Sequence, residues 1–217
     1  MLTSVNETLR EILGRIQHKV TDQWPCRRCG VIQSVRLLSL QGDLCTLCLT
    51  EHRQSVALEK IRHQVGPKYA HSRFETFRET KVTTSAVQVL KQYVEKPGSG
   101  IFLFGPTGAG KTHLATGMMR ALIEQGRDCQ YVTMPELLMH LKKSFDPSQS
   151  SCEEDLLANY STSILILDDL GVGPITEWVR QIVHLLLDKR DRYLKPTILV
   201  SNLRLEEIAD LFGEPIA

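Results

Sequence analysis

The fold is decided by the stretch Gly100-Ile101-Phe102-Leu103-Phe104-Gly105-Pro106-Thr107-Gly108-Ala109-Gly110-Lys111-Thr112. A short apolar run, typical of a buried strand, leads into a glycine-rich turn, and residues 113–124 then follow a helical pattern. The turn fits the spacing G-x-x-x-x-G-K-[ST], which between a strand and a helix indicates a phosphate-binding P-loop. The sequence therefore predicts an α/β domain that binds a nucleotide.

A P-loop surrounds the phosphates of a nucleotide with backbone N–H groups of the loop and of the following helix N-terminus. Its glycines let the backbone approach the phosphates and adopt positive φ angles. We expect Lys111 to reach the β- and γ-phosphates of ATP, and the Thr112 hydroxyl to bind Mg²⁺. The alternative is a glycine-rich turn without a nucleotide. The residues expected to hold ATP in this loop are Gly105, Pro106, Thr107, Gly108, Ala109, Gly110, Lys111 and Thr112.

Strand and helix patterns alternate from the P-loop to the end of the sequence. The expected strands are continuous aliphatic runs, which indicate a parallel sheet covered by helices on both faces. A capping box from Thr133 to Glu136 opens a helix that reaches about residue 145. The expected strands span residues 101–104, 129–133, 163–167 and 197–202, and the other helices span 84–95, 153–160, 175–192 and 205–212.

Polar side chains stand where two of these strands end, at the edge of a parallel sheet that binds ligands. Asp168 is expected to hold Mg²⁺ as a hard oxygen ligand, directly or through water. Asp169 would orient or deprotonate an attacking water, and Asn202 would bind the γ-phosphate or that water. Carboxylates can also merely cap a turn, and asparagine is a common turn residue. The P-loop favours one ATP site whose catalytic residues are Lys111, Asp168, Asp169 and Asn202.

Two Cys-x-x-Cys pairs lie near the start of the chain: Cys26 with Cys29, and Cys45 with Cys48, separated by fifteen residues. This spacing is typical of a tetrahedral Zn²⁺ site with four thiolate ligands. Four cysteines leave no open position on the metal, so the expected zinc is structural and stabilises the fold of a small module. Redox-active pairs are the alternative, but that motif normally occurs once, near a βαβ pattern.

Apolar residues at helical spacing predict one helix before the zinc module, over residues 2–20, and one after it, over residues 49–65. The apolar stripe of the first helix either joins the core or meets a partner. Gly66-Pro67 ends the second helix, so we expect a domain boundary there. Residues 1–65 would form the zinc module and residues 66–217 the ATPase domain, which opens with an ordered entry segment up to Phe77.

The composition limits the classes of protein that fit. The chain has 217 residues, of which 42% are apolar, and this suits one or two domains with a real core. A net charge of +1 gives no global basic field for nucleic acid, although local basic patches remain open. No apolar run approaches about 18 residues and no signal peptide is visible, so we expect a cytoplasmic protein. In that reducing compartment, the paired cysteines favour metal over disulfides.

Three motifs in this order resemble one family. The P-loop, Ile-Leu-Ile-Leu-Asp-Asp-Leu-Gly at 164–171 and Thr-Ile-Leu-Val-Ser-Asn at 197–202 resemble AAA+ ATPases, and among them the DnaC/IstB-like helicase loaders and transposition helpers. The stretches Arg73-Phe74-Glu75-Thr76-Phe77 and Leu211-Phe212-Gly213-Glu214 are also similar, so the resemblance covers residues 58–217. It implies that Asn202 is the sensor 1 residue, and that ATP turnover occurs where copies of the chain associate.

The resemblance also implies partners, namely a hexameric replicative helicase and single-stranded DNA. A zinc module ahead of the ATPase is similar to that of Gram-positive-type loaders, in which this module grips the helicase. Two short basic pairs could contact DNA phosphates: Lys142-Lys143, near which the family has a DNA-contacting element, and Arg27-Arg28. Such pairs are also common on solvated faces. Of the two other cysteines, we expect Cys129 in a buried strand and Cys152 in a loop.

The sequence departs from the family pattern in two ways. Most AAA+ proteins have Asp-Glu where this chain has Asp168-Asp169, and the shorter Asp169 is expected to slow hydrolysis. The pattern also continues beyond Leu-Gly-Glu with a fifth strand, a lid and an arginine finger, which is worth ~10³–10⁵ in rate. Residues 213–217 contain none of these, so we expect weak turnover by this chain alone. The arginines that could substitute, or could be surface charges, are Arg180, Arg190, Arg192 and Arg204.

Three functions fit these observations. The first is an ATP-dependent loader that delivers or remodels a replicative helicase on single-stranded DNA, and the zinc module favours it. The second is a transposition helper that uses the same ATPase core on double-stranded DNA with a transposase. The third is an adaptor that binds ATP without useful turnover, while its zinc module binds a replication protein.

Overall fold

The computed structural model describes residues 24–33, 44–143, 160 and 162–213. The chain divides into two compact units, Met1–His52 and Arg53–Ala217. This division falls inside helix α2 (Thr46–Gln64), whereas the sequence places a domain boundary at Gly66-Pro67, just after that helix ends. The helix expected over residues 2–20, nearly all of that over 153–160, and Cys152 lie outside the described residues.

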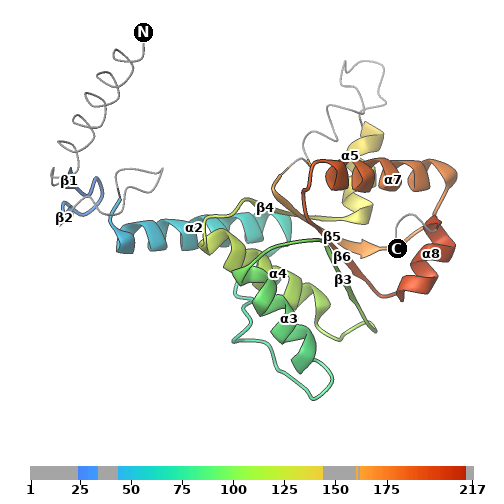
Figure 1. Ribbon diagram of the computed structural model, residues 1–217, viewed down its shortest axis with the longest axis horizontal. Coiled ribbons are helices and arrows are strands. Elements are labelled where there is room, and N and C mark those ends of the chain that lie inside the picture. The colour runs from blue at the N-terminus through green and yellow to red at the C-terminus, as the bar shows by residue number, and fades with distance from the viewer. Residues whose placement is uncertain (1–23, 34–43, 144–159, 161, 214–217) are drawn as a thin grey trace, which may run out of the picture. The chain divides into compact units, whose positions relative to one another are not determined.

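The second unit is built on a four-stranded sheet (Figure 1). Its strands are β3 (Ile101–Phe104), β4 (Cys129–Thr133), β5 (Ile164–Leu170) and β6 (Thr197–Ser201). They lie in the order β3-β6-β5-β4, and every neighbouring pair is parallel, as the aliphatic runs predict. The carboxyl ends of all four strands therefore meet at one edge of the sheet.

Helices cover both faces of this sheet (Figure 1). On one face pack α3 (Thr84–Glu95), α4 (Lys111–Glu124) and part of α2. On the other pack α5 (Met134–Lys143), α7 (Glu177–Arg192) and α8 (Leu205–Phe212). Strand β5 supplies both cores because its side chains alternate between the faces: Ile164 and Ile166 join the α4 side, while Leu165 and Leu167 join the α7 side.

Strand β5 is longer than the sequence predicts, because it continues through both carboxylates to Leu170. Its register against β6 shifts between Leu167 and Leu170, and Asp169 there has a φ of 57°. The left-handed conformation costs little for aspartate compared with bulkier residues. Charged side chains usually mark the end of a buried strand, but Asp168 is only 2% exposed and is held by hydrogen bonds.

The other boundaries lie close to the expected ones. Helix α4 begins at Lys111, so the lysine of the P-loop is its first residue. Helix α7 begins at Glu177 because the hydroxyl of Thr176 caps it, accepting a hydrogen bond of 3.3 Å from the N–H of Val179. The predicted capping box of α5 is confirmed: the Glu136 carboxylate accepts from the N–H of Thr133 at 3.1 Å, and the Thr133 hydroxyl accepts from the N–H of Glu136 at 3.3 Å.

The entry segment before α3 packs along α4. It contains a short 3₁₀ helix, η1 (Pro67–Tyr69), and its backbone is held by Arg120, which donates to the carbonyls of Ala70 and Ser72. Gly117 makes this close approach possible, because a Cβ atom there would lie 3.2 Å from the backbone of Arg73. Arg120 is buried and fully engaged, so this arginine serves the fold.

The first unit contains a small antiparallel hairpin that the sequence does not predict. Its strands are β1 (Trp24–Pro25) and β2 (Ile32–Gln33), and two hydrogen bonds, from Cys26 N–H to the Val31 carbonyl and from Gly30 N–H to the Cys26 carbonyl, close its turn. Strands of two residues are too short to show a period in the sequence. Among the described helices of both units, none has the length and apolar character needed to cross a membrane.

Candidate nucleotide site and four-cysteine cluster

The P-loop lies between β3 and α4 and has the backbone that phosphate binding requires. Gly108 and Gly110 have φ angles of 83° and 87°, which side chains other than glycine adopt only with strain. A Cβ atom on Gly110 would also lie 2.5 Å from the ring of Phe77, in the entry segment. This ring in turn lies 5.6 Å from that of His113, the third residue of α4. Phe77 therefore packs against the loop at Gly110, a position that leaves no room for a side chain.

Lys111 links the ends of two strands. Its ammonium donates to the carbonyls of Gly105 and Pro106 at 2.8 and 3.0 Å, and to the Oδ1 atom of Asn202 at 2.7 Å. Asn202 directly follows β6, which pairs with β3, so the sheet order places the two residues side by side. The structure thus brings together a lysine and an amide that lie 91 positions apart in the sequence.

Thr112 and Asp168 form the other half of the site. The hydroxyl of Thr112 donates to the Oδ2 atom of Asp168 at 2.9 Å, and the N–H of Asp169 donates to Oδ1 at 2.7 Å. A threonine hydroxyl beside a carboxylate is a pair of hard oxygen ligands, which suits Mg²⁺ next to nucleotide phosphates. The donor set therefore fits the metal that the P-loop implies.

Asp169 has an environment suited to a base. Burial and the neighbouring Asp168 carboxylate raise the pKa of Asp169, and the Lys111 ammonium offsets part of that rise. A carboxylate with a raised pKa holds a proton more strongly than an ordinary aspartate, so it can take one from water more readily. Its side chain is only partly exposed, at the edge where the strands end.

Tyr131 is a contact of this site that the sequence does not indicate. It lies in β4, and its hydroxyl donates to the Oδ2 atom of Asp168 at 2.6 Å in the protein interior. The pattern around Tyr131 is that of an ordinary buried strand. Only the pairing of β4 with β5, in which Tyr131 faces Ile166, places its ring beside Asp168. The sequence around Tyr131 alone cannot predict this contact, because it depends on which strand lies beside β4.

Arg190 is the best anchored of the four arginines proposed as substitutes for a finger. Only 3% of Arg190 is exposed, and its guanidinium donates to the Thr197 hydroxyl at 2.8 Å and to four carbonyls, those of Tyr160, Thr162, Ser163 and Pro196. It therefore cannot reach a nucleotide on another copy of the chain. Arg192 is exposed and forms an ion pair of 2.7 Å with Asp188, and Arg180 donates to the Leu211 carbonyl at 2.7 Å. No described contact relates Arg204 to the nucleotide site.

Replacing Arg190 with methionine is expected to lower the free energy of unfolding by about 3 kcal/mol or more, because buried carbonyls then lose their charged donor. The matched variant Arg192→Met, in the same helix, removes only an exposed ion pair and is expected to cost less than about 1 kcal/mol. Chemical denaturation of both variants measures the difference. Equal losses would contradict the structural role assigned to Arg190.

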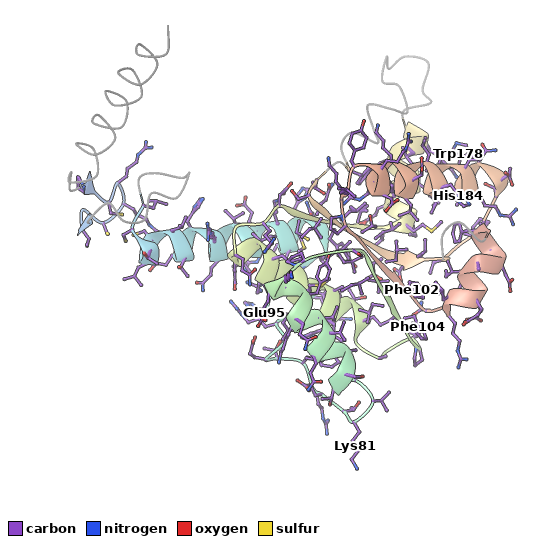
Figure 2. The ribbon with its side chains drawn as sticks, in the orientation of Figure 1. Lys81, Glu95, Phe102, Phe104, Trp178 and His184 are labelled. Carbon is purple, nitrogen blue, oxygen red and sulfur yellow. The ribbon has the colours of Figure 1, made fainter. Side chains whose placement is uncertain are left out.

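The two basic pairs proposed for DNA are exposed where the structure describes them. Lys142 lies at the end of α5 with its ammonium 6.0 Å from the ring centroid of Trp178, a residue of α7 (Figure 2). A cavity of about 580 Å³ adjoins these two residues. In the first unit, Arg28 forms an exposed ion pair with Glu51 at 3.2 Å. None of these contacts tests DNA binding, so DNA contact by either pair stays a prediction.

The four paired cysteines converge in the first unit. Their sulfur atoms all lie within 4.8 Å of one another, and those of Cys29 and Cys45 are 3.6 Å apart. A tetrahedral zinc site with bonds of about 2.3 Å requires sulfur separations of about 3.8 Å. Cys26 and Cys29 come from the turn of the hairpin, whereas Cys45 precedes α2 and Cys48 lies in its first turn. The cluster can therefore hold a metal ion.

Backbone N–H groups favour the thiolate form of Cys26. The N–H of Cys45 donates to the sulfur of Cys26 at 3.2 Å, and with the N–H of Cys29 it lowers the pKa of Cys26 to about 6. A thiolate rather than a thiol binds metals, so Cys26 is ready to do so at neutral pH. Cys129, by contrast, is buried in β4 of the other unit, where burial raises its pKa to about 12.

Known proteins resemble this chain in sequence. It is 28% identical to the replicative helicase loader DnaC of Escherichia coli (strain K12) over 183 residues, which cover 81% of this chain and 74% of DnaC. It is 33% identical to the replicative helicase loader DnaI of Bacillus subtilis (strain 168) over 125 residues, 57% of this chain and 40% of DnaI.

Solved structures share the fold. The crystal structure of the DnaC helicase loader matches with a TM-score of 0.61 and 24% identity, over 69% of this chain and 92% of that one. The structure of AMPPCP-bound DnaA from Aquifex aeolicus matches with a TM-score of 0.55 and 20% identity, over 68% of this chain and 48% of that one. These likenesses confirm the predicted AAA+ fold.

The family of IstB-like ATP binding proteins matches residues 61–217, which include the P-loop, both aspartates and Asn202. This match begins near the end of α2, after the four-cysteine cluster. The chain belongs to the family of IstB-like ATP binding proteins.

Proposed function

We propose that this chain is an ATP-dependent helicase loader, which delivers or remodels a hexameric replicative helicase on single-stranded DNA during replication. The observation that carries this proposal is the similarity to the replicative helicase loader DnaC, which extends over 81% of the chain. Membership of an ATP-binding family and the geometry around Lys111 support the ATP dependence.

In this proposal the P-loop backbone binds the phosphates of ATP. Lys111 exchanges its carbonyl partners for phosphate oxygens, and Asn202, already in contact with Lys111, binds the γ-phosphate or the attacking water. Thr112 and Asp168 hold Mg²⁺, which offsets the negative charge of the phosphates when it is bound. Asp169 orients the water and takes its proton.

The remaining parts act in assembly. We assign residues 1–65 to a zinc module in which Cys26, Cys29, Cys45 and Cys48 hold a structural Zn²⁺, and residues 66–217 to the ATPase domain. The module binds the helicase. Copies of the chain associate through the ATPase domain, single-stranded DNA contacts their basic residues, and the protein acts in the cytoplasm. Binding of ATP orders the strand ends around Asp168 and Asn202 and so changes the affinity for the partners.

A second candidate is a transposition helper that acts with a transposase on DNA. The match to the IstB-like family favours it, because the group that this chain resembles includes transposition helpers as well as helicase loaders. The two functions share the nucleotide site and differ in the protein partner. A test of the partner therefore separates them.

The test mixes the purified full chain with the hexameric replicative helicase of its host and follows the complex by sedimentation, with and without ATP and Mg²⁺. We expect a stable complex whose helicase is recovered on circular single-stranded DNA more often with ATP than without it. Deleting residues 1–52, which removes the four cysteines but keeps the part of α2 that packs on the sheet, is expected to abolish the complex. If the chain binds no helicase with or without ATP but does bind a transposase, the loader proposal is wrong and the chain is a transposition helper.

A further inference from the structure

Asp168 receives a hydrogen bond from a second side chain that lies outside the nucleotide loop. The Tyr131 hydroxyl donates to Oδ2 at 2.6 Å, the same oxygen that accepts from Thr112 at 2.9 Å. Tyr131 is 5% exposed and Asp168 is 2% exposed, so water does not compete for this contact. Hydrogen bonds to an ionised carboxylate in the interior are short and strong.

The three groups that donate hydrogen bonds to Asp168 differ in whether they must also bind the nucleotide or its metal ion. Thr112 belongs to the P-loop helix and is itself an expected ligand of Mg²⁺, so its hydroxyl must turn toward the cation. The N–H of Asp169 donates to the opposite oxygen, Oδ1. Tyr131 is the donor to Oδ2 that has no nucleotide or metal to bind. It can hold the carboxylate in the same orientation before and after ATP enters.

Tyr131 is itself held from two sides. Its N–H donates to the side-chain carbonyl of Gln64, in α2, at 2.9 Å. This bond satisfies the backbone of β4, which is an edge strand of the described sheet. Its ring packs in the same apolar cluster as Met118 and Ile166.

We propose that Tyr131 is a positioning residue for the metal site, which fixes the Asp168 carboxylate so that it faces Thr112 and the bound cation. This inference rests on the nucleotide site proposed above. It gives Tyr131, and so strand β4, a part in ATP binding, although Tyr131 belongs to no P-loop or strand-end motif. Without the hydroxyl, the carboxylate keeps its charge but loses one of the contacts that orient it.

The variant Tyr131→Phe tests this role because it keeps the ring and its packing. We expect the Mg²⁺ concentration that half-saturates ATP binding to rise about tenfold, since one charge-assisted hydrogen bond is lost. Affinity for ATP without metal should stay within about twofold of wild type, because Lys111 and the P-loop are untouched. With Mn²⁺ in place of Mg²⁺, electron paramagnetic resonance should show more free ion at the same concentrations of protein and ATP.

The matched control is Tyr160→Phe. The Tyr160 hydroxyl is also buried and contacts His140 Nδ1 at 2.7 Å, but it touches no residue of the proposed site. Tyr131→Phe should lose at least as much thermal stability as Tyr160→Phe, and only Tyr131→Phe should change the metal dependence. A folded Tyr131→Phe variant with the wild-type Mg²⁺ and Mn²⁺ titrations would show that the hydroxyl is purely structural and would overturn the inference.

The two proposals fail in different ways. If wild type shows no Mg²⁺-dependent binding of ATP, the nucleotide site itself is wrong, and this role of Tyr131 is rejected with it. If wild type binds ATP with Mg²⁺ and both tyrosine variants behave alike, the site stands and only Tyr131 loses its role. Circular dichroism establishes that each variant is folded before its titration. Should Tyr131→Phe prove unfolded, the variant Gln64→Leu, which frees the N–H of Tyr131, must shift the metal dependence in the same direction.

Discussion

Replacing Lys111 with alanine is expected to weaken the binding of ATP at least ~100-fold, because charged hydrogen bonds to two phosphates contribute roughly 1.5–3 kcal/mol each. Lys111 already lies at the meeting point of the P-loop and Asn202, with three acceptors within 3.0 Å of its ammonium. Alanine would remove the hydrogen bond that links the P-loop helix to Asn202, the residue after β6. Isothermal titration of wild type and variant with ATP and Mg²⁺ measures the difference.

The control for this prediction is Lys81→Ala. Lys81 is exposed in the loop before α3 (Figure 2), so its loss removes the same charge without touching the nucleotide site. Its affinity for ATP should match that of wild type. Equal affinity in Lys111→Ala and wild type would reject the P-loop as the phosphate site.

Replacing Cys48 with alanine is expected to remove the metal from the four-cysteine cluster and unfold the module around it. Wild type should contain one zinc ion per chain, and the variant close to none. Structural zinc contributes about 10–16 kcal/mol to the folding of small zinc-finger peptides, far more than the hairpin of two-residue strands can supply. Metal analysis, and the thiolate absorption bands of the cobalt-substituted protein, measure the loss.

Cys129→Ala is the matched control. Cys129 is also buried, but it lies in β4 of the second unit and is not one of the four clustered cysteines, and its raised pKa of about 12 keeps it a thiol. This variant should keep the metal and lose only about 1 kcal/mol of stability from a small cavity. Zinc retained in full by Cys48→Ala would contradict the four-thiolate site.

The sequence predicts the parallel α/β architecture of the second unit but not its strand order. Buried parallel strands are aliphatic along their whole length, so the runs at 101–104, 164–167 and 197–201 stand out against the amphipathic helices between them. The P-loop glycines mark a backbone that only glycine adopts easily. Both features are local: they depend only on residues that are close together in the sequence, so they can be recognised without the structure.

Other features depend on strand order, which no local pattern contains. Tyr131 meets Asp168 because β4 lies beside β5, and Asn202 meets Lys111 because β6 lies beside β3. The second pair could be expected from the general rule that ligands bind at strand ends. The first could not, since tyrosine is a common residue of buried strands.

Arginine shows the same limit. Arg190 and Arg192 are two positions apart in α7, and the sequence treats both as charged residues of one helix. The structure buries the first, which donates to the carbonyls of Tyr160 and Thr162, and leaves the second in solvent. Only the tertiary packing distinguishes Arg190, which donates hydrogen bonds to buried carbonyls, from Arg192, which a partner could contact.

The most direct measurement is a titration of the full chain with ATP, in the presence and absence of Mg²⁺, followed by calorimetry. The contacts of Lys111 with Asn202 and of Thr112 with Asp168 predict saturable binding of one ATP per chain, tighter with Mg²⁺ than without it. No saturable binding of ATP at any concentration of Mg²⁺ would contradict the nucleotide site on which the proposed loading of a helicase depends.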